Sequence, residues 1–386
     1  MSTGSSFGKA ALIALTTLVS EGAISKEHGS KEAEGQIHYP LGSQPSFTGP
    51  EDKFTGDVSV QVLFPGTDET DYSGAYVTFS AGAHTAWHSH PAGQHMVVTE
   101  GKALTGTRDG KVYEFSEGET VWCPSDIDHW HGATPHSSMT HLVITNSKDG
   151  ENVTWKKTLS DDEYQAALKQ IAQGTDIEGL SVQERNLVRV AAYAAADQQE
   201  GLKIALNDAL DSGVTISELR ESLIHLYSYT GFPRSLNALG NLMGMVESRR
   251  EAGKKDTMGA EPSTIAADKN SREVGEQVQT ELVGQKVSGP LFDFAPGIND
   301  YLQSHLFGDI FARGVLDYKQ RELLTVAILA SLEGTDSQLN AHIGIATNTG
   351  VSQAQLQGVA ETLAVYKGRK YAARVTGAVD SVLGKQ

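Results

Sequence analysis

The sequence predicts a multidomain protein in which an all-β barrel is followed by an all-α domain. Residues 54–158 hold short β-branched and aromatic runs separated by Gly, Pro and Asp turn signals, a pattern typical of a small barrel or sandwich. After Leu159 the alanine, leucine and Glu/Gln content rises and the apolar period shifts toward 3.6, as in helices. With 386 residues the chain is long enough for two or three domains.

The composition excludes several classes of function. Lys and Arg number 31 against 48 Asp and Glu, a net charge of −17, and no basic cluster is present, so we expect no nucleic-acid partner. The single cysteine, Cys123, excludes an intramolecular disulfide, a CxxC redox pair and a multi-cysteine zinc site. Hydrophobic residues make up 39% of the chain, which is enough for packed cores.

The segment 1–25 is interpreted as a signal peptide. Lys9 precedes an apolar run over residues 10–19, and a small-x-small triplet follows at residues 23–25. This interpretation predicts a periplasmic or secreted protein with no membrane segment in its mature form. The alternative is an amphipathic helix that is not cleaved, which would leave the protein cytoplasmic. Residues 26–53 are polar and rich in Gly, Ser and Pro, so we expect a linker there.

Two pairs of histidines carry the strongest chemical signal. His88 and His90 are two residues apart on a predicted strand, so both side chains lie on the same face, and His129 and His131 repeat this relation. Two strands that direct histidines inward can converge on one ion. Imidazole nitrogen is a ligand for Zn, Mn, Fe, Ni and Cu.

The spacing around these histidines resembles the two metal-binding motifs of the cupin superfamily. The resemblance implies a double-stranded β-helix, or jelly roll, over residues 54–158, with a divalent metal held by His88, His90, Gln94 and His129. The family's usual acidic ligand is replaced by neutral Gln94. A neutral ligand shell leaves the full metal charge, which favours Lewis-acid chemistry over redox cycling. The alternative is a cupin that has lost its metal.

The stretches TAWHSHPAGQ, DHWHGATP and MTHL resemble a subgroup of small cupins that includes manganese-dependent hydroxynitrile lyases. The resemblance implies one metal per chain, with Mn as the first candidate and Fe, Zn, Ni or Cu as alternatives. It also implies an acid–base role for His141. His141 and His131 are therefore candidate catalytic residues, with packing in the core as the alternative for each. We expect His84 and His95 to lie outside the site.

An internal repeat at a constant offset organises the helical half. Residues 211–214 align with residues 348–351, an offset of 137 that also relates Tyr229 to Tyr366 and Gly231 to Gly368. Two helical repeats are predicted, over 160–250 and 286–386. The charged, Gly- and Ser-rich segment 251–285 is predicted to be a linker between them.

The second repeat resembles the carboxymuconolactone decarboxylase family, and the first reads as a degenerate copy. The resemblance implies an all-α fold that assembles into a trimer or another ring, so a homo-oligomer is expected. One branch of the family uses a CxxC, but residues 334–337 (GTDS) take its place here, which excludes thiol chemistry. The family's glutamate and histidine match Glu322 and His342, whereas Arg185 and Ala205 stand at the paired positions of the first repeat.

Each polar candidate in the helical half has a structural alternative. His342 can transfer a proton or cap an interface, and Glu322 can act in catalysis or form a buried ion pair. Arg313 and Arg321 flank this region in the sequence, where they can hold a substrate carboxylate or form part of a solvated charged face.

These features favour an enzyme. The expected activity is that of a metal-dependent lyase or decarboxylase acting on a small organic acid, lactone or cyanohydrin-like substrate, with the metal as Lewis acid and a histidine as acid–base group. The alternatives are a non-catalytic protein that binds or senses a small ligand or metal, and a cupin dioxygenase. Because a fold does not fix a reaction, the substrate stays open.

Overall fold

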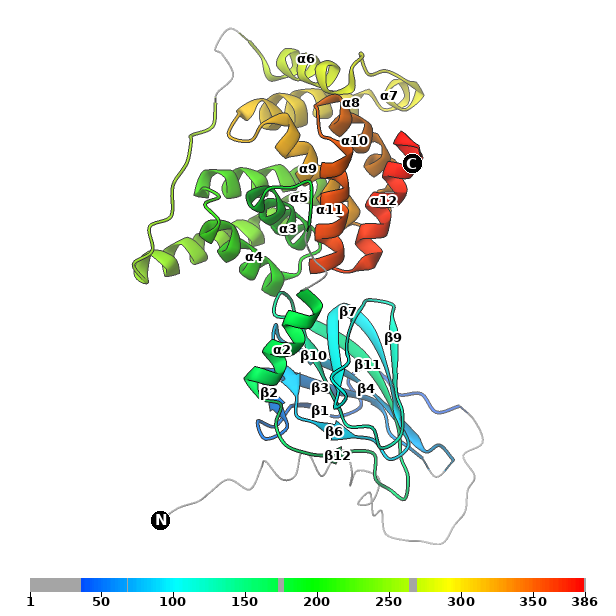
Figure 1. Ribbon diagram of the computed structural model, residues 1–386. Helices are drawn as coiled ribbons and strands as arrows, with labels where there is room; N and C mark the ends of the chain where they lie inside the picture. Colours follow the sequence, from blue (N-terminus) through cyan, green and yellow to red (C-terminus); the bar gives the residue numbers. More distant parts are fainter. Residues whose placement is uncertain (1–35, 68, 173–176, 264–268, 385–386) are drawn as a thin grey trace. The chain divides into compact units, whose positions relative to one another are not determined.

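The computed structural model describes residues 36–67, 69–172, 177–263 and 269–384 (Figure 1). The chain divides into two compact units, one ending at Thr175 and the other formed by the remainder. The predicted signal peptide, residues 1–25, lies outside the described residues. No helix among the described residues is long and apolar enough to cross a bilayer.

The first unit is the predicted β barrel. Its described strands form one antiparallel network: β1 (Ser46–Thr48), β2 (Phe54–Thr55), β3 (Val58–Phe64), β4 (Tyr72–Phe79), β5 (His84–Thr85), β6 (His88–Ser89), β7 (Gln94–Thr107), β8 (Val112–Ser116), β9 (Thr120–Cys123), β10 (His129–Ala133), β11 (Met139–Asn146) and β12 (Thr154–Trp155). Strand β1 pairs with β3, so the prediction that residues 26–53 are all linker is wrong at residues 46–48.

The strand register brings the predicted site residues together. On β10, His129 pairs with His88 of β6. On β11, Thr145 pairs with Gln94 of β7, and alternate β11 residues, His141 among them, are buried. This alternation is the period-2 pattern of a strand that faces the core on one side.

A helix closes one side of the barrel. Helix α2 (Asp161–Ala172) packs Tyr164 and Ala167 against Trp87, Leu104 and Trp130 of the barrel. The hydroxyl of Tyr164 donates a hydrogen bond to the Ala133 carbonyl at 2.8 Å. The compact unit that contains the barrel therefore extends beyond the predicted boundary at residue 158, and it includes a helix that the sequence analysis assigned to the first repeat.

The second unit contains the two helical repeats. The first repeat contributes α3 (Val182–Ala195), α4 (Gln199–Asp211) and α5 (Ile216–Glu251); the second contributes α9 (Tyr318–Ala330), α10 (Asp336–Asn348), α11 (Gln353–Tyr366) and α12 (Arg369–Leu383). Helices α4 and α10 are related by the predicted offset, as are the first residues of α5 and α11. Gly231 interrupts α5 with φ 75°, at the position where Gly368 separates α11 from α12 with φ 129°. Glycine tolerates such positive φ values. The predicted repeat is confirmed.

The segment between the repeats is more ordered than a linker. It contains α6 (Ser271–Val283), which packs against η1 (Leu302–Ile310), a π-helix, in a small apolar cluster of its own. The short helices α7 (Pro290–Phe294) and α8 (Pro296–Tyr301) precede η1, and the 3₁₀ turn η2 (Phe311–Arg313) follows it. The expectation of a linker over 251–285 is therefore wrong for residues 271–283.

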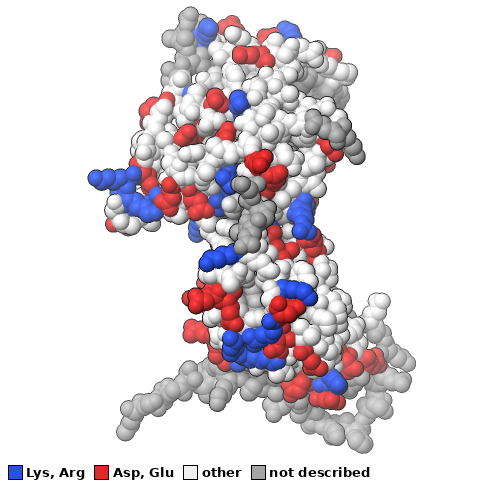
Figure 2. Space-filling model, in the orientation of Figure 1, with Lys and Arg blue, Asp and Glu red and all other residues white. Residues whose placement is uncertain are grey.

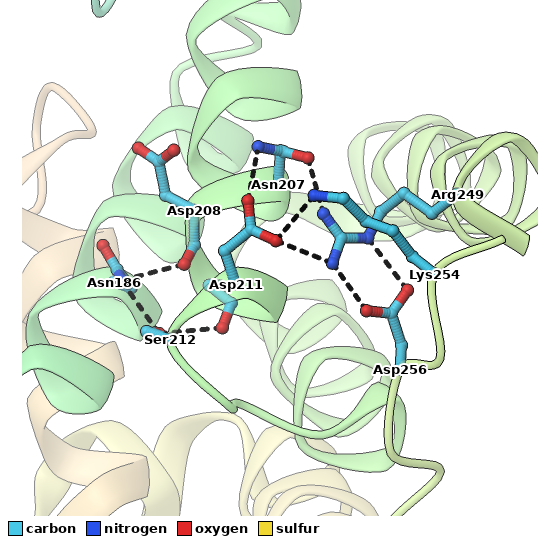
Figure 3. A network of polar contacts seen from close by, with 9 residues as sticks. Asn186, Asn207, Asp208, Asp211, Ser212, Arg249, Lys254 and Asp256 are labelled. Atoms are coloured by element: carbon cyan, nitrogen blue, oxygen red, sulfur yellow. Dashed lines mark hydrogen bonds and ion pairs between the residues drawn. The ribbon is translucent and has the colours of Figure 1, made fainter. Parts of the chain in front are cut away.

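A polar network fixes the chain where it leaves α5 (Figure 3). The buried guanidinium of Arg249 binds both carboxylate oxygens of Asp256, at 2.9 and 2.6 Å, and also contacts Asp211 at 2.9 Å. It donates a further hydrogen bond to Asn207 at 2.7 Å, and Lys254 reaches Asp211 at 2.8 Å. Arg249 lowers the pKa of Asp256 mainly through these hydrogen bonds. The network therefore anchors the segment after α5 onto α4.

The network generates a stability prediction. Arg249→Ala leaves the largely buried carboxylate of Asp256 without its partner, and breaking a buried pair in this way should lower the free energy of unfolding by about 2–4 kcal/mol. Lys255→Ala, at an exposed neighbouring position, should change it by less than about 0.5 kcal/mol. Urea denaturation followed by circular dichroism measures both. Equal stability of the two variants would contradict the prediction.

Candidate functional site

A cluster of buried histidines fills one end of the barrel core. The rings of His88 and His129 lie 4.3 Å apart, and His90 lies 5.1 Å from His88 and 5.3 Å from His129. His131 stands 5.0 Å from His88, and His141 stands 4.8 Å from His131. All five side chains are buried. Burial disfavours the charged form and lowers the pKa of each of them.

Backbone carbonyls orient three of these rings. Each Nδ1 donates to a carbonyl oxygen: His88 to Ala86 at 2.9 Å, His90 to Asn152 at 2.6 Å, and His129 to Ile127 at 3.1 Å. Because a carbonyl can only accept, this pattern places the proton on Nδ1 and leaves the Nε2 lone pair available. Metal-binding histidines are commonly held in this way.

A hydrogen bond also orients the Gln94 side chain and leaves its acceptor atom available. Its amide nitrogen donates to the Thr145 hydroxyl at 2.8 Å, which leaves Oε1 as the free atom. Oε1 of Gln94 and Nε2 of His90 and His129 are buried and have no hydrogen-bond partner among the described residues. Buried acceptors without a donor are unfavourable unless something else satisfies them. A cation would satisfy all of them together, so these residues fit a divalent metal.

A second possible set of metal ligands consists of three histidines and differs from the first set by one residue. His88, His129 and His131 each offer one ring nitrogen, and these nitrogens all lie within 4.8 Å of one another. This triad could bind a metal. It includes His131 in place of His90, but the Nδ1 of His131 has no carbonyl partner among the described residues to orient the ring. The rings that carbonyls orient are those of His88, His90 and His129, and His131 lies beside them.

The ring of His141 is a neighbour of the His131 ring. Its side chain is 0% exposed, and neither ring nitrogen has a hydrogen-bond partner within the described part of the chain. Burial lowers the pKa of His141 to about 3, so the ring is neutral at pH 7. Phe79 packs its edge against both His131 and His141, which restricts their rings.

The two other barrel histidines near the motifs lie outside the cluster, as expected. His84 is buried on the other side, against Trp130 and Tyr164. His95 is exposed and stacks on Trp122. A cavity of about 60 Å³ borders His129 and is lined mainly by uncharged groups, including Tyr113, Val121, Trp122, Pro124 and Ile127. This hollow is smaller than an ordinary ligand pocket, which measures about 300–1,000 Å³.

The helical unit holds a second buried polar cluster. His342 on α10 shares a hydrogen bond of 2.8 Å with Glu322 on α9, so the structure brings these two predicted residues together. Glu322 is 0% exposed, and its second oxygen has no hydrogen-bond partner among the residues that the structure describes. The Tyr229 ring of α5 lies 6.0 Å from His342, and burial raises the pKa of Tyr229. The first repeat thus completes a site in the second.

The predicted role of the arginines is not supported. Arg321 is fully buried and bonds Glu221 of α5 at 2.8 Å, so it is neither a solvated surface residue nor free for a substrate. Arg313 bonds the same carboxylate at 3.0 Å. His225, which the sequence analysis missed, contacts Thr325 at 2.8 Å. The only signal for these partners was the spacing of four between Glu221, His225 and Tyr229 on one helix face.

The pairing of the repeats needs a correction of one residue. Glu322 is the fifth residue after its N-cap Asp317, and Asn186 is the fifth after its N-cap Ser181. The counterpart of Glu322 is therefore Asn186, not Arg185. The buried Arg189 bonds the Asn186 side chain at 2.8 Å and stacks on Tyr366 at 3.9 Å. The first repeat has neither acid nor histidine at this place.

Comparisons with known proteins agree with this division. A cupin domain model matches residues 75–145, and the carboxymuconolactone decarboxylase family model matches residues 162–242 and 296–379. The chain is 44% identical over 124 residues to an (R)-mandelonitrile lyase of Granulicella tundricola, and the match covers 32% of this chain and 95% of that one. It is 28% identical over 98 residues to a 4-carboxymuconolactone decarboxylase of Acinetobacter baylyi, covering 24% and 72%.

Among solved structures, a cupin-like protein of Thermotoga maritima shares 35% sequence identity with the chain. The match covers 31% of this chain and 91% of that one, with a TM-score of 0.30. The family match from residue 162 includes α2, the helix that packs on the barrel.

The geometry predicts how metal content responds to mutation. The purified protein should contain about one divalent ion per chain, and the double variant His88→Ala/His129→Ala should lose it, because two of four donors are removed. His95→Ala removes an exposed imidazole and should leave the content unchanged. Elemental analysis after gel filtration measures this. Equal metal in the wild type and the double variant would refute the site.

Proposed function

Because the chain belongs to the cupin family through its barrel and carries two copies of the carboxymuconolactone decarboxylase family, we propose that it is a metal-dependent lyase with its working site in the barrel. The proposed substrate is a small organic acid, lactone or cyanohydrin-like molecule. The observation that carries the proposal is the set of buried acceptors on His90, Gln94 and His129, which have no partner among the described residues.

The proposed ligands are Nε2 of His88, His90 and His129 and Oε1 of Gln94. Mn is the first candidate metal, followed by Fe, Zn, Ni and Cu. When bound, such a metal supplies Lewis-acid stabilisation of negative charge on a substrate oxygen. The carbonyls of Ala86, Asn152 and Ile127 hold the imidazoles in place. All four donors are neutral, so they do not reduce the positive charge of the site.

The proposed acid–base groups are His141 and His131. His141 is neutral and held against Phe79, so it can take a proton from a substrate hydroxyl and return it to a leaving group. The buried surroundings keep bulk water away from this transfer. The ring of His131 contacts both His141 and His88, so in this proposal His131 shares the proton or orients a substrate.

A second candidate activity lies in the helical unit. The buried carboxylate of Glu322 bonds His342 at 2.8 Å, which is the arrangement of an oriented acid–base pair. Tyr229 supplies a hydroxyl-bearing ring nearby. In this proposal a lactone or carboxylic acid is the substrate, and the barrel and the helical unit act as separate sites.

Two other proposals compete for the barrel: a protein that captures or senses a small ligand, and a dioxygenase. They are distinguished by assay, since the first predicts binding without turnover and the second predicts consumption of O₂. For localisation we propose a periplasmic or secreted protein. The appearance of the full-length chain in the cytoplasmic fraction would contradict this.

The acid–base role generates a prediction for His141. His141→Ala should reduce turnover of cyanohydrins, lactones or organic acids about 10²-fold or more while the metal content stays full, because acid–base groups contribute about 10²–10⁴. His84→Ala changes a buried histidine outside the cluster and is the matched control. Steady-state kinetics beside elemental analysis measures both. Full turnover by His141→Ala would rule out the assigned role.

Replacing the neutral ligand tests the charge of the shell. Gln94→Glu keeps an oxygen donor and adds one negative charge, so metal affinity should hold or rise while Lewis acidity and turnover fall. Affinity is measured by competition with a chelator, and turnover by initial rates. An unchanged turnover number would show that ligand charge does not limit the reaction.

A third comparison separates the two units. If the barrel is the working site, His342→Ala and Glu322→Gln should leave turnover within about twofold of wild type, because neither residue belongs to the barrel unit. The reverse pattern, with His342→Ala inactive and His141→Ala normal, would place the reaction in the helical unit.

A further inference from the structure

We propose that the second half of α5 is a dimerisation surface that pairs with the same helix of a second copy of this chain. Along this half run Phe232, Leu236, Leu239, Met243, Val246 and Arg250, spaced alternately four and three positions apart. We call these six residues the α5 seam. Such spacing produces the continuous stripe by which two helices pack side by side. The adjoining stripe of α5, including Ala238 and Leu242, is already buried inside the unit.

The α5 seam is both apolar and exposed, whereas the exposed face of an ordinary surface helix is polar. The side chains of Phe232, Leu236 and Met243 are 63%, 61% and 72% exposed, and Leu239 and Val246 are half-buried. A groove of about 440 Å³ runs beside them and is lined largely by apolar groups from both halves of α5. Contiguous apolar surface of this kind marks an interaction site.

The second repeat provides an internal comparison. Helix α12 is the counterpart of this half of α5. The positions on α12 that correspond to Phe232, Leu236, Leu239 and Met243 are Arg369, Ala373, Thr376 and Asp380. These four counterparts are polar or small, as expected of a face in contact with water, whereas Val246 corresponds to another apolar residue, Leu383. The two faces descend from the same repeat, so the apolar character of the α5 seam is specific to it. The fold itself does not require it.

The glycines beside the seam point to another helix. Gly240 and Gly244 lie within α5, where glycine costs roughly 1 kcal/mol relative to alanine. A Cβ atom at either position would meet nothing within 4 Å, so neither glycine serves packing within the described part of the chain. Small residues spaced by four allow two helix backbones to approach closely.

The chemistry of the seam fits a second copy. In an antiparallel pair centred at Asn241, Met243 meets Leu239 and Val246 meets Leu236 of the other copy. Arg250 then meets the Phe232 ring, a cation–π partner. The groove rim carries both charge signs, with Arg220 and Arg250 beside Glu247, as a self-complementary surface requires. Figure 2 shows Lys and Arg side chains gathered at the C-terminal end of α5, where Arg250 also pairs with Glu247 at 3.2 Å.

The first test introduces charge into the seam. Light scattering of the full chain at micromolar concentration should report an even multiple of the 41.3 kDa mass, because this contact joins chains in pairs. Leu236→Glu should weaken this pairing by about 100-fold or more, because the carboxylate would be buried in an apolar contact. Ala373→Glu makes the same change at the counterpart position on α12 and should leave the dimer intact. Circular dichroism verifies that both variants fold.

The second test traps the pair covalently. Gly240→Cys places a thiol at the centre of the proposed interface, and mild oxidation should give a disulfide-linked dimer. Gly377→Cys, at the counterpart position on α12, has equally open surroundings and should give no linked dimer under the same treatment. The native Cys123 is buried, and its thiol pKa is raised to about 12, so it does not interfere.

Three results would overturn the proposal: a monomeric wild type, an assembly that Leu236→Glu leaves intact, or equal cross-linking of Gly240→Cys and Gly377→Cys. A monomer would also leave the surface to a different protein partner. Barrel activity is not part of this test, so its outcome is independent of the proposed function.

Discussion

The barrel depends on how its buried imidazoles are satisfied. Five histidines are buried together, and a neutral imidazole still has one donor and one acceptor to satisfy. Backbone carbonyls accept from Nδ1 of His88, His90 and His129, which fixes the rings and leaves the Nε2 of each as an acceptor. Buried acceptors without a donor are unfavourable on their own and favourable around a cation. The strand register places Thr145 beside Gln94, and the hydrogen bond between them leaves Oε1 of Gln94 as a further acceptor. A small, mainly uncharged cavity borders His129.

The sequence predicted the ligand-type residues because a strand has a strict period of two. His88, His90 and His129 could be placed on inward faces from their spacing alone. The position of His131 within the tightest triad depends on ring orientation, and the carbonyl tethers come from residues 86, 127 and 152, which have no recognisable motif. In the helical half, the constant offset predicted the repeats and the glycine at the bend. It missed the shift of one residue at Asn186, because the offset differs between helices. It also missed the Glu221–Arg321 pair, which bridges helices from different repeats.

The two repeats have diverged in complementary ways. The second keeps the acid and the histidine, while the first supplies Tyr229, His225 and Glu221 to the same cluster. At the pseudo-symmetric place, Arg189 occupies the space and stacks on Tyr366, the counterpart of Tyr229. Duplication therefore allowed one half to hold the acid–histidine pair and the other to support it. The repeats differ at the surface as well. Phe232, Leu236 and Met243 are exposed apolar residues on α5, whereas the corresponding residues of α12 are Arg369, Ala373 and Asp380.

Helix α2 packs on the barrel although its sequence matches the helical family. It falls within the match to the helical family, yet it buries Tyr164 and Ala167 against Trp87, Leu104 and Trp130 of the barrel. The barrel unit therefore ends after α2, and a helix inside the match to the helical family belongs to the core of the barrel unit. A gene fragment that ends at residue 158 would encode a barrel with two uncovered tryptophans and would tend to aggregate. An excision that keeps the barrel core intact therefore has to be made after α2, although the match to the helical family begins within this helix.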